Sequence, residues 1–531
     1  MTSLLQVEEI STARLEAQFE ALLEEFCIVH SRIEKLIKEE SRADLAPLAE
    51  TLIRFAQLSR DNFYAHQTEP QATRGKVQHS DFNSRQSNQQ ETLQKIRREW
   101  MNLYPLVEQR CPESPTHLAL QLKVADAMAN DCLNRTGSPV SCLTTFGMTF
   151  DLSIRYASKV YEAVYPRVPT VMIPLANRRD PWLWIGIGHE VGHYVWDHSD
   201  LKTLLPGSLA HQALEILNQD KALGHDQLSQ WNEWLEEVFA DIFGVLILGP
   251  AFVRSFVAWL SSNISQENLL ENDHDHALPL LRPLIQLWAL RELENFSLSS
   301  NTSAAPPEDY SETGPSGWQE IFGLASPLPE GPDIFKATEI LQQWLDFLTR
   351  LTPDNDLDYW LDQVIDETLI RDYLSLIPGV VKAVVEIFLS SGTVQYYTPD
   401  IHTQVMQLVK TLSSNELANR EKLSSGALSI AVAWYAWEQI TTNSRLKGKG
   451  RKQRLDKIRE FVWGQKIDND AAANLYCEDT AWPQEGLNEL LTQRVTNLRE
   501  GGMKNEKAIA KRLRESEFSA REDWWCRYCD F

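Results

Sequence analysis

Two histidines and a glutamate occur at a spacing that suits a metal site. The segment 189–193 reads HEVGH, so His189 and His193 are four residues apart. In a helix, that spacing places both imidazoles on one side, a turn apart. Neutral imidazoles suit zinc, and a catalytic zinc keeps one coordination position open for water. Zinc lowers the pKa of such a water toward about 7, and the carboxylate of Glu190 can take its proton.

The residues around this motif favour a helix over about 181–198. Asp180 can cap it, and Pro181 suits the first helical position, where its missing N–H costs nothing. On such a helix Glu190 points about 60° away from His193, so it can reach a water on the metal without being a ligand. The alternative is a satisfied pair of histidines on a surface helix, and a chain of this length and composition contains an HExxH motif by chance in roughly two cases in a hundred.

A second segment, about 227–248, offers the third ligand that a catalytic zinc requires. Glu237 and Asp241 lie four residues apart on a helix that is otherwise apolar from residue 238 onward. Two carboxylates at the edge of a core helix cost desolvation unless a metal and a histidine N–H compensate. We expect Glu237 to bind zinc and Asp241 to orient one of the two histidines. Glu233 and Glu236 are alternative ligands, and a solvated acidic face is the interpretation without a metal.

HEVGH at 189–193 followed by EVFAD at 237–241 resembles the gluzincin metallopeptidases, the thermolysin-like group, over about residues 112–295. The resemblance implies a peptidase domain that binds one Zn²⁺ per chain. It also implies an edge strand before the first helix that aligns a peptide substrate. Residues 168–174 are placed for that role.

The resemblance further implies a later histidine or arginine that stabilises the oxyanion of the tetrahedral intermediate, because a developing charge gains most from preset donors. His276 is the favoured residue and Arg282 the next, within a His-x-x-Pro-x-x-Arg stretch. A surface histidine cluster that ends a loop is the alternative interpretation.

The pattern of the whole chain predicts a mostly α fold with a small β-sheet, in which a zinc peptidase domain is flanked by helical regions. The predicted division is an N-terminal helical region at 1–111 with a polar loop at 65–92, the peptidase domain at 112–296, a Pro/Ser/Gly-rich linker at 297–333, and a C-terminal helical domain at 334–531.

Local periodicity places the individual elements. Helices are expected over about 8–60, 93–107 and 117–133. Apolar and polar residues alternate over 150–156, which predicts a half-buried strand. A second strand at 170–174 ends in Pro174, which indicates that it lies at a sheet edge or ends there. Residues 427–437 are apolar almost all round and predict a buried helix.

The net charge of −23 argues against a nucleic-acid binder as the description of the whole molecule. One segment differs, because 445–459 carries eight basic residues and one aspartate. A solvated loop and helix start explains it most simply, and a docking site for an acidic partner or nucleic acid is the alternative.

The sequence favours the cytoplasm. The first ten residues lack the basic charge of a secretory signal, and the longest apolar stretch is about a dozen residues where a membrane span needs roughly 20. Seven scattered cysteines fit free thiols in a reducing compartment. Cys526 and Cys529 form a single CxxC without a second pair, so we expect free thiols there too.

Together these features predict a zinc endopeptidase that acts on a protein or peptide. Its large helical additions favour narrow specificity or control by a protein partner. Three alternatives remain: a zinc-containing sensor or scaffold whose helical regions bind a partner, a zinc hydrolase acting on non-peptide bonds, and an interaction protein with a chance motif.

Overall fold

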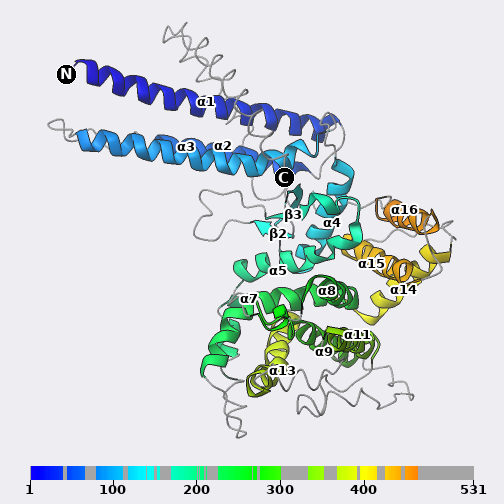
Figure 1. Cartoon of the computed structure of the whole chain (residues 1–531). Helices are drawn as coiled ribbons and strands as arrows, with labels where there is room; N and C mark the ends of the chain where they lie inside the picture. Colours follow the sequence, from blue (N-terminus) through cyan, green and yellow to red (C-terminus); the bar gives the residue numbers. More distant parts are fainter. Residues whose placement is uncertain are drawn as a thin grey trace. The chain divides into compact units, whose positions relative to one another are not determined.

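A computed structural model shows a mostly helical chain with one small three-stranded sheet, which confirms the predicted fold class (Figure 1). The chain splits into two compact units. Unit 1 comprises residues 1–117, 160–167 and 469–531, and unit 2 comprises 118–159 and 168–468. The structure describes residues 2–39, 45–65, 79–111, 118–138, 140–148, 152–155, 169–199, 201–202, 204–208, 211, 225–265, 267–271, 276–300, 333–351, 367–390, 395–414, 425–443 and 449–463.

The described part of unit 1 consists of α1 (Thr2–Glu39), α2 (Ala46–Ala65) and α3 (His79–Glu108). Aromatic side chains join the three helices: Phe19 of α1 stacks on Phe63 of α2 with ring centroids 4.2 Å apart, and Phe26 of α1 lies 4.4 Å from Trp100 of α3. These contacts form a core of their own.

Two boundaries in unit 1 differ from the prediction. The helix expected over 8–60 is two helices, since α1 ends at Glu39 and α2 begins at Ala46. The loop expected over 65–92 is wrong from His79 onward, where α3 begins, and residues 66–78 lie outside the described part. Gln, Glu and Arg favour helix nearly as well as Ala. The polar first residues of α3 can therefore be helical without apolar periodicity of their own, because the helix continues into a segment with a buried face.

The sheet of unit 2 has the order β1-β3-β2, formed by β1 (Leu143–Gly147), β3 (Thr170–Pro174) and β2 (Ser153–Arg155). β1 pairs with β3 in parallel and β2 pairs with it antiparallel. The central strand is thus the one that we expected at the edge. Pro174 is its last residue and lies opposite Gly147, so the proline ends the strand. The edge strand next to the candidate site is β2.

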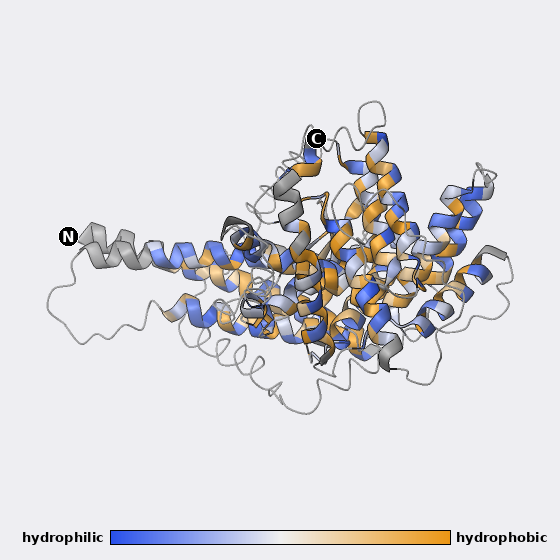
Figure 2. Cartoon of the chain, turned by 90° about the horizontal axis from the view of Figure 1, so that it is seen from below, coloured by the Kyte–Doolittle hydropathy of each residue, from blue (hydrophilic) through white to orange (hydrophobic). Residues whose placement is uncertain are grey.

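The remaining helices of unit 2 are α4 (Ala119–Asn134), α5 (Ile187–His198), α7 (His225–Leu248), α8 (Pro250–Asn263), α9 (Arg282–Ser300), α11 (Ala337–Leu351), α13 (Glu367–Ser390), α14 (Pro399–Ser414), α15 (Gly426–Thr442) and α16 (Lys449–Trp463). The 3₁₀ helices are η2 (Leu175–Asn177), η3 (Pro181–Gly186) and η4 (Glu267–Leu270). Their apolar faces turn toward one another (Figure 2), and the buried side chains from Leu122 to Val462 form one hydrophobic core. α15 is buried over 427–436, as its sequence predicted.

The predicted linker falls largely outside the described residues. α9 continues to Ser300, and the description resumes at Asp333. Glu294 and Arg291 of α9 hold the chain at that point: Glu294 accepts the backbone N–H of Phe335, and Arg291 lies 3.5 Å from Asp333. The compact unit defined by contacts contains helices on both sides of the predicted linker. The domain boundaries drawn from the sequence stay predictions.

The helix that carries the HEVGH motif begins differently from the expectation. Its first turns form η3, and the α-helix α5 starts only at Ile187. Asp180 makes no side-chain cap. Its carboxylate instead accepts a hydrogen bond of 2.8 Å from Arg459 of α16, whose guanidinium also lies over the ring of Trp182. Part of the basic segment 445–459 is therefore used to fix the start of the motif helix.

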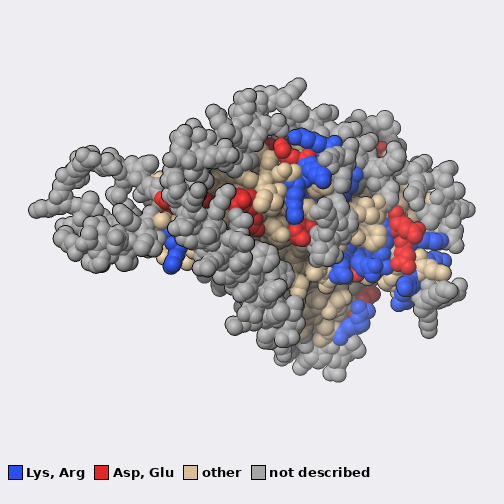
Figure 3. Space-filling model, turned by 90° about the horizontal axis from the view of Figure 1, so that it is seen from above, with Lys and Arg blue, Asp and Glu red and all other residues tan. Residues whose placement is uncertain are grey.

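The docking role considered for that segment stays a prediction. Arg459 has two acidic neighbours, Asp180 and Asp456, both at 2.8 Å. On the face drawn in Figure 3, described Lys and Arg side chains are interspersed with Asp and Glu side chains. Among the helices that the structure describes, none is long and apolar enough to cross a membrane.

Small residues let α5 and α7 approach closely. A Cβ added at Gly192 would lie 2.8 Å from the Cα and 3.3 Å from the carbonyl oxygen of Ala240, and these backbone atoms cannot move aside alone. A Cβ at Gly188 would meet Leu248 at 2.8 Å and the Cα of Gly244 at 3.6 Å. The side chains of α5 and α7 that lie beside these glycines can therefore converge on one point between the two helices.

Gly192→Ala is expected to destabilise the protein by about 1–3 kcal/mol, the usual cost of overpacking a tight contact. Denaturant unfolding followed by tryptophan fluorescence measures the change. Gly207→Ala is the control, because a Cβ there has no atom within 4 Å, and a helical Gly→Ala change in open space is neutral or slightly stabilising. Equal unfolding midpoints for the two variants would show that the contact between α5 and α7 does not require a glycine at position 192.

Candidate metal centre

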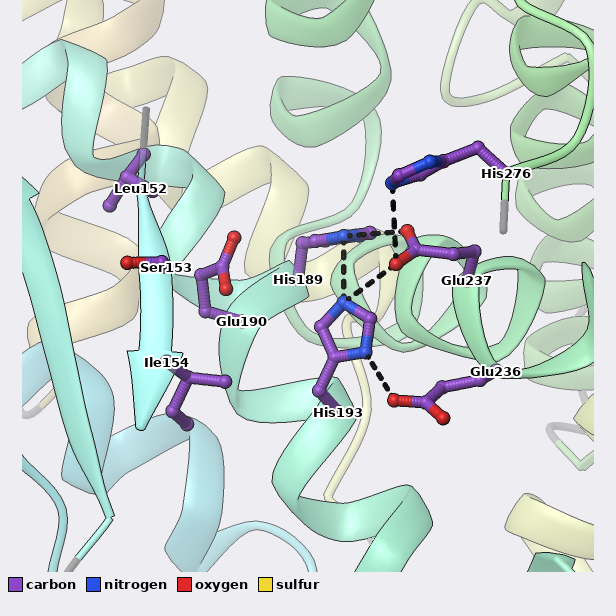
Figure 4. A pocket seen from close by; sticks show the side chains of 9 residues that line it. All are labelled: Leu152, Ser153, Ile154, His189, Glu190, His193, Glu236, Glu237 and His276. Carbon is purple, nitrogen blue, oxygen red and sulfur yellow. Dashed lines mark hydrogen bonds and ion pairs between the residues drawn. The ribbon is translucent and has the colours of Figure 1, made fainter. Parts of the chain in front are cut away.

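Three side chains from α5 and α7 converge on one point: His189, His193 and Glu237 (Figure 4). The two histidine Nε2 atoms are 3.2 Å apart. Oε2 of Glu237 lies 3.3 Å from Nε2 of His189, and its Oε1 lies 3.3 Å from Nε2 of His193. Each side chain is 13–15% exposed. These residues could hold a metal ion, as the sequence predicted.

The spacing of the two imidazole nitrogens suits a metal ion. Zinc with ligands at about 2.0–2.1 Å requires neighbouring ligand atoms roughly 3.3–3.4 Å apart. The two imidazole nitrogens are 3.2 Å apart, and each lies 3.3 Å from a different oxygen of Glu237, so the nitrogen pair matches that requirement and the carboxylate faces both imidazoles. Oε2 of Glu237 is also buried, and its cationic neighbours are Nε2 of His189 at 3.3 Å and Nη2 of Arg282 at 3.8 Å.

Asp241 lies behind His189 and is 1% exposed. Its Oδ1 is 3.0 Å from Nδ1 of His189, the nitrogen that faces away from the other ligands. Arg282 donates to both oxygens of Asp241, from Nε and Nη2, each at 2.8 Å. The guanidinium also lies 4.7 Å from the centre of the Phe256 ring. These contacts place Asp241 at the outer nitrogen of His189, and its expected role in orienting that histidine stays a prediction.

Arg282 therefore occupies a place that the sequence did not indicate. It was the second choice for an oxyanion donor, but it is not among the residues that line the cavity at the triad. Its guanidinium binds Asp241, and its closest approach to a predicted ligand is 3.8 Å, to Oε2 of Glu237. The partner of Arg282 depends on how α9 packs on α7, and spacing along the sequence does not contain that information.

The second histidine also has a carboxylate behind it. Oε1 of Glu236 lies 3.0 Å from Nδ1 of His193. We had considered Glu236 only as an alternative ligand, and the structure places it on the outer nitrogen of His193 rather than in the triad. The sequence signal for this contact was the position of Glu236 immediately before Glu237. One residue corresponds to a rotation of about 100° around α7, which places Glu236 on the side of His193. The other alternative, Glu233, instead accepts a hydrogen bond of 3.2 Å from Gln230 on its own helix.

The carboxylates control the charge of the triad. Burial lowers the pKa of His189, but Asp241 and Glu237 outweigh it and raise that pKa to about 10. Burial raises the pKa of Glu237, but His189, His193 and Arg282 outweigh it and lower that pKa to about 2. The pKa of Asp241 is likewise lowered, mainly by Arg282 against its burial. A proton on His189 balances these carboxylates, and a metal cation held by the same groups would provide the same balance.

Glu190 lies between the triad and β2 (Figure 4). Burial raises the pKa of its carboxyl group above the usual range, while His189 and His193 oppose that rise. The carboxylate accepts a hydrogen bond from the backbone N–H of Ile154 in β2. A carboxylate in this position is near the three candidate ligands without belonging to that group.

His276 approaches the triad from the other side. Its Nε2 lies 3.4 Å from Oε1 of Glu237, and its side chain is 42% exposed. It is not part of the group whose ligand atoms lie within 4.8 Å of one another, so it is a neighbour of the triad rather than a fourth ligand. That position is suitable for donating a hydrogen bond to a group bound in the cavity.

These side chains surround an open cavity of about 580 Å³. Its walls are formed by β2, α5, α7 and the segment before α9, through Leu152, Ser153, Ile154, His189, Glu190, His193, Glu236, Glu237 and His276. Within the described sheet, β2 pairs on one side only. An edge strand, a metal triad and a carboxylate outside the triad therefore border the same space.

Asp241→Asn is expected to weaken metal binding by roughly 10–100-fold, the usual effect of removing the carboxylate behind a ligating histidine. Competition with a chromophoric chelator measures the dissociation constant for Zn²⁺. Asp346→Asn on α11 serves as the control, because Asp346 is exposed and bonds only Gln342 in the described structure. An unchanged zinc affinity in Asp241→Asn would mean that Asp241 does not orient a ligand.

Neither a protein-family model nor a curated protein nor a solved structure matches this chain.

Proposed function

We propose that this chain is a zinc-dependent metallopeptidase of the gluzincin type. The observation that carries the proposal is the position of Glu190 between the His189–His193–Glu237 triad and the edge strand β2, in one cavity. Two imidazoles and a carboxylate are a ligand set found in zinc peptidases, and they leave a coordination position for reaction.

In the proposed reaction, His189, His193 and Glu237 hold the ion. When bound, zinc lowers the pKa of water and polarises the scissile carbonyl. Glu190 accepts the proton of the attacking water and passes it to the leaving amine. His276 donates a hydrogen bond to the oxyanion that develops on the carbonyl. This assignment replaces Arg282 as an oxyanion donor and makes it a positioning residue, since its guanidinium is bound to Asp241.

The cavity supports a peptide as the substrate. An extended chain can add to the open side of an edge strand through backbone hydrogen bonds, and β2 offers that side at the cavity wall. Glu190 is bonded to the N–H of Ile154 on the same strand, so a peptide paired there would lie against the proposed base. The large helical parts of the chain support narrow specificity or control by a protein partner.

The competing proposal is a metal-containing sensor or scaffold whose helices bind another protein. A structural metal site is closed and needs no base, whereas this triad opens onto a cavity that includes Glu190. We also propose a cytoplasmic location, since the described cysteines 27, 111, 132 and 142 are free thiols.

The proposed function is tested by incubating the zinc-loaded full chain with a peptide library and identifying new termini by mass spectrometry. We expect cleavage that a chelator stops and added Zn²⁺ restores. Zinc binding without cleavage of any peptide would favour the scaffold instead. Rapid degradation of unfolded casein without any partner would disprove narrow specificity while keeping the peptidase.

A further inference from the structure

One carboxylate in the cavity has no role in the proposed catalysis. Glu236 lines the cavity and its side chain is 40% exposed. Oε1 faces Nδ1 of His193 at 3.0 Å, and the described structure gives Oε2 no hydrogen-bond partner. The second oxygen of this carboxylate points away from His193 (Figure 4).

The other charges of the site compensate one another. A divalent ion in the triad would balance Glu237 and Glu190. Asp241 is neutralised by Arg282 through two hydrogen bonds of 2.8 Å. What remains among the acidic groups of the described cavity wall is the single negative charge of Glu236.

No cation of the described cavity wall answers that charge. The lining residues include no lysine or arginine. Lys202 is near enough to interact electrostatically with Glu236, but its ammonium is 2.8 Å from Asp197 and 58% exposed. The cavity thus presents, next to the candidate ligand His193, one carboxylate with which no lysine or arginine of the described wall pairs. A cationic group of a substrate would be attracted to the Glu236 carboxylate, and an anionic group would be repelled by it.

We infer that Glu236 selects substrates carrying a lysine or arginine side chain beside the bond that is cleaved. The inference rests on the proposed peptidase function and adds the substrate class. Glu236 would have two tasks: one oxygen accepts the N–H of His193, and the other meets the cationic side chain. Because the carboxylate is partly exposed, the expected preference is modest, about fivefold. It should weaken at 0.5 M salt, where the Debye length falls to roughly 4 Å.

The test compares arginine with citrulline, which has nearly the same shape and no charge. Peptides acetylated at the N-terminus and amidated at the C-terminus carry one such residue, scanned through the positions around the cleavage site. Dissociation constants are measured by fluorescence anisotropy with zinc-loaded Glu190→Gln, which binds without turnover under the proposed mechanism. We expect about fivefold tighter binding of arginine peptides at one position.

The decisive variant adds Glu236→Gln to Glu190→Gln. The amide oxygen of glutamine can still accept the N–H of His193, so zinc affinity should stay within about tenfold, while the preference for arginine disappears. Glu233→Gln in the same background is the matched control, since Glu233 lies on the same helix but is not a lining residue. It should retain the full preference.

The outcomes separate the two proposals. Equal affinity for arginine and citrulline peptides at every position would overturn the role of Glu236 and leave the peptidase intact. A preference that survives Glu236→Gln would also overturn it. The same peptides are also measured without acetylation, and a preference seen only there would assign the charge to recognition of a free α-amino group and overturn the side-chain specificity. Failure of the wild type to cleave any peptide would count against the proposed function itself.

Discussion

Glu190→Gln is expected to lower kcat/KM for peptide hydrolysis by about 10²–10⁴-fold, the usual contribution of a positioned general base. Glutamine keeps the size of the side chain and can no longer take a proton from water. Glu190 is not one of the three candidate ligands, so the variant should still bind one metal ion per chain. Initial rates on one cleaved peptide, together with metal content, measure both effects.

The matched control for this change is Glu233→Gln, which removes a carboxylate from α7 outside the cavity and should leave the rate unchanged. If Glu190→Gln keeps a rate within tenfold of the wild type, Glu190 is not the base. Loss of metal together with loss of activity would give Glu190 a role in holding the site rather than in proton transfer.

Glu237→Ala should remove the metal. The change leaves only His189 and His193 at the centre, and two imidazoles from one helix cannot complete the ligand set of a catalytic zinc. The loss of affinity should exceed the roughly 10–100-fold expected for a residue that only orients a ligand. A chelator competition titration gives the zinc dissociation constant, and hydrolysis should disappear with the metal.

Glu233→Ala is the control for Glu237→Ala, one turn earlier on α7. It should bind zinc like the wild type, because its carboxylate accepts from Gln230 and does not approach the triad. Unchanged zinc affinity in Glu237→Ala would mean that another carboxylate, Glu236 or Asp241, completes the site. The two variants Glu190→Gln and Glu237→Ala together separate loss of the base from loss of the ion.

The candidate site was predictable where helical geometry alone determines the arrangement. The four-residue spacing of His189 and His193, and of Glu237 and Asp241, places each pair on one face of its helix. The apolar residues that follow Glu237 also showed that this helix is a core element with acids at its edge. The packing of α5 against α7 at Gly188 and Gly192 then brings the two pairs together.

The partners of Arg282 and the strand order were not predictable in this way. Arg282 reaches Asp241 only because α9 packs beside α7, a contact between residues 41 positions apart. β3 became the central strand because β1 pairs with it across a long connection. Pairing between distant strands depends on both partners, so the proline at the end of one strand could not identify the edge. The start of α3 was missed for a local reason, because its first residues have no apolar face.

The most direct measurement is the zinc content per chain of the full protein purified without added metal, by inductively coupled plasma mass spectrometry. About one zinc per chain, lost in Glu237→Ala and retained in Glu190→Gln, is the predicted result. A wild-type protein that holds no zinc, and takes up none after reconstitution, would contradict the metal centre and with it the peptidase proposed here.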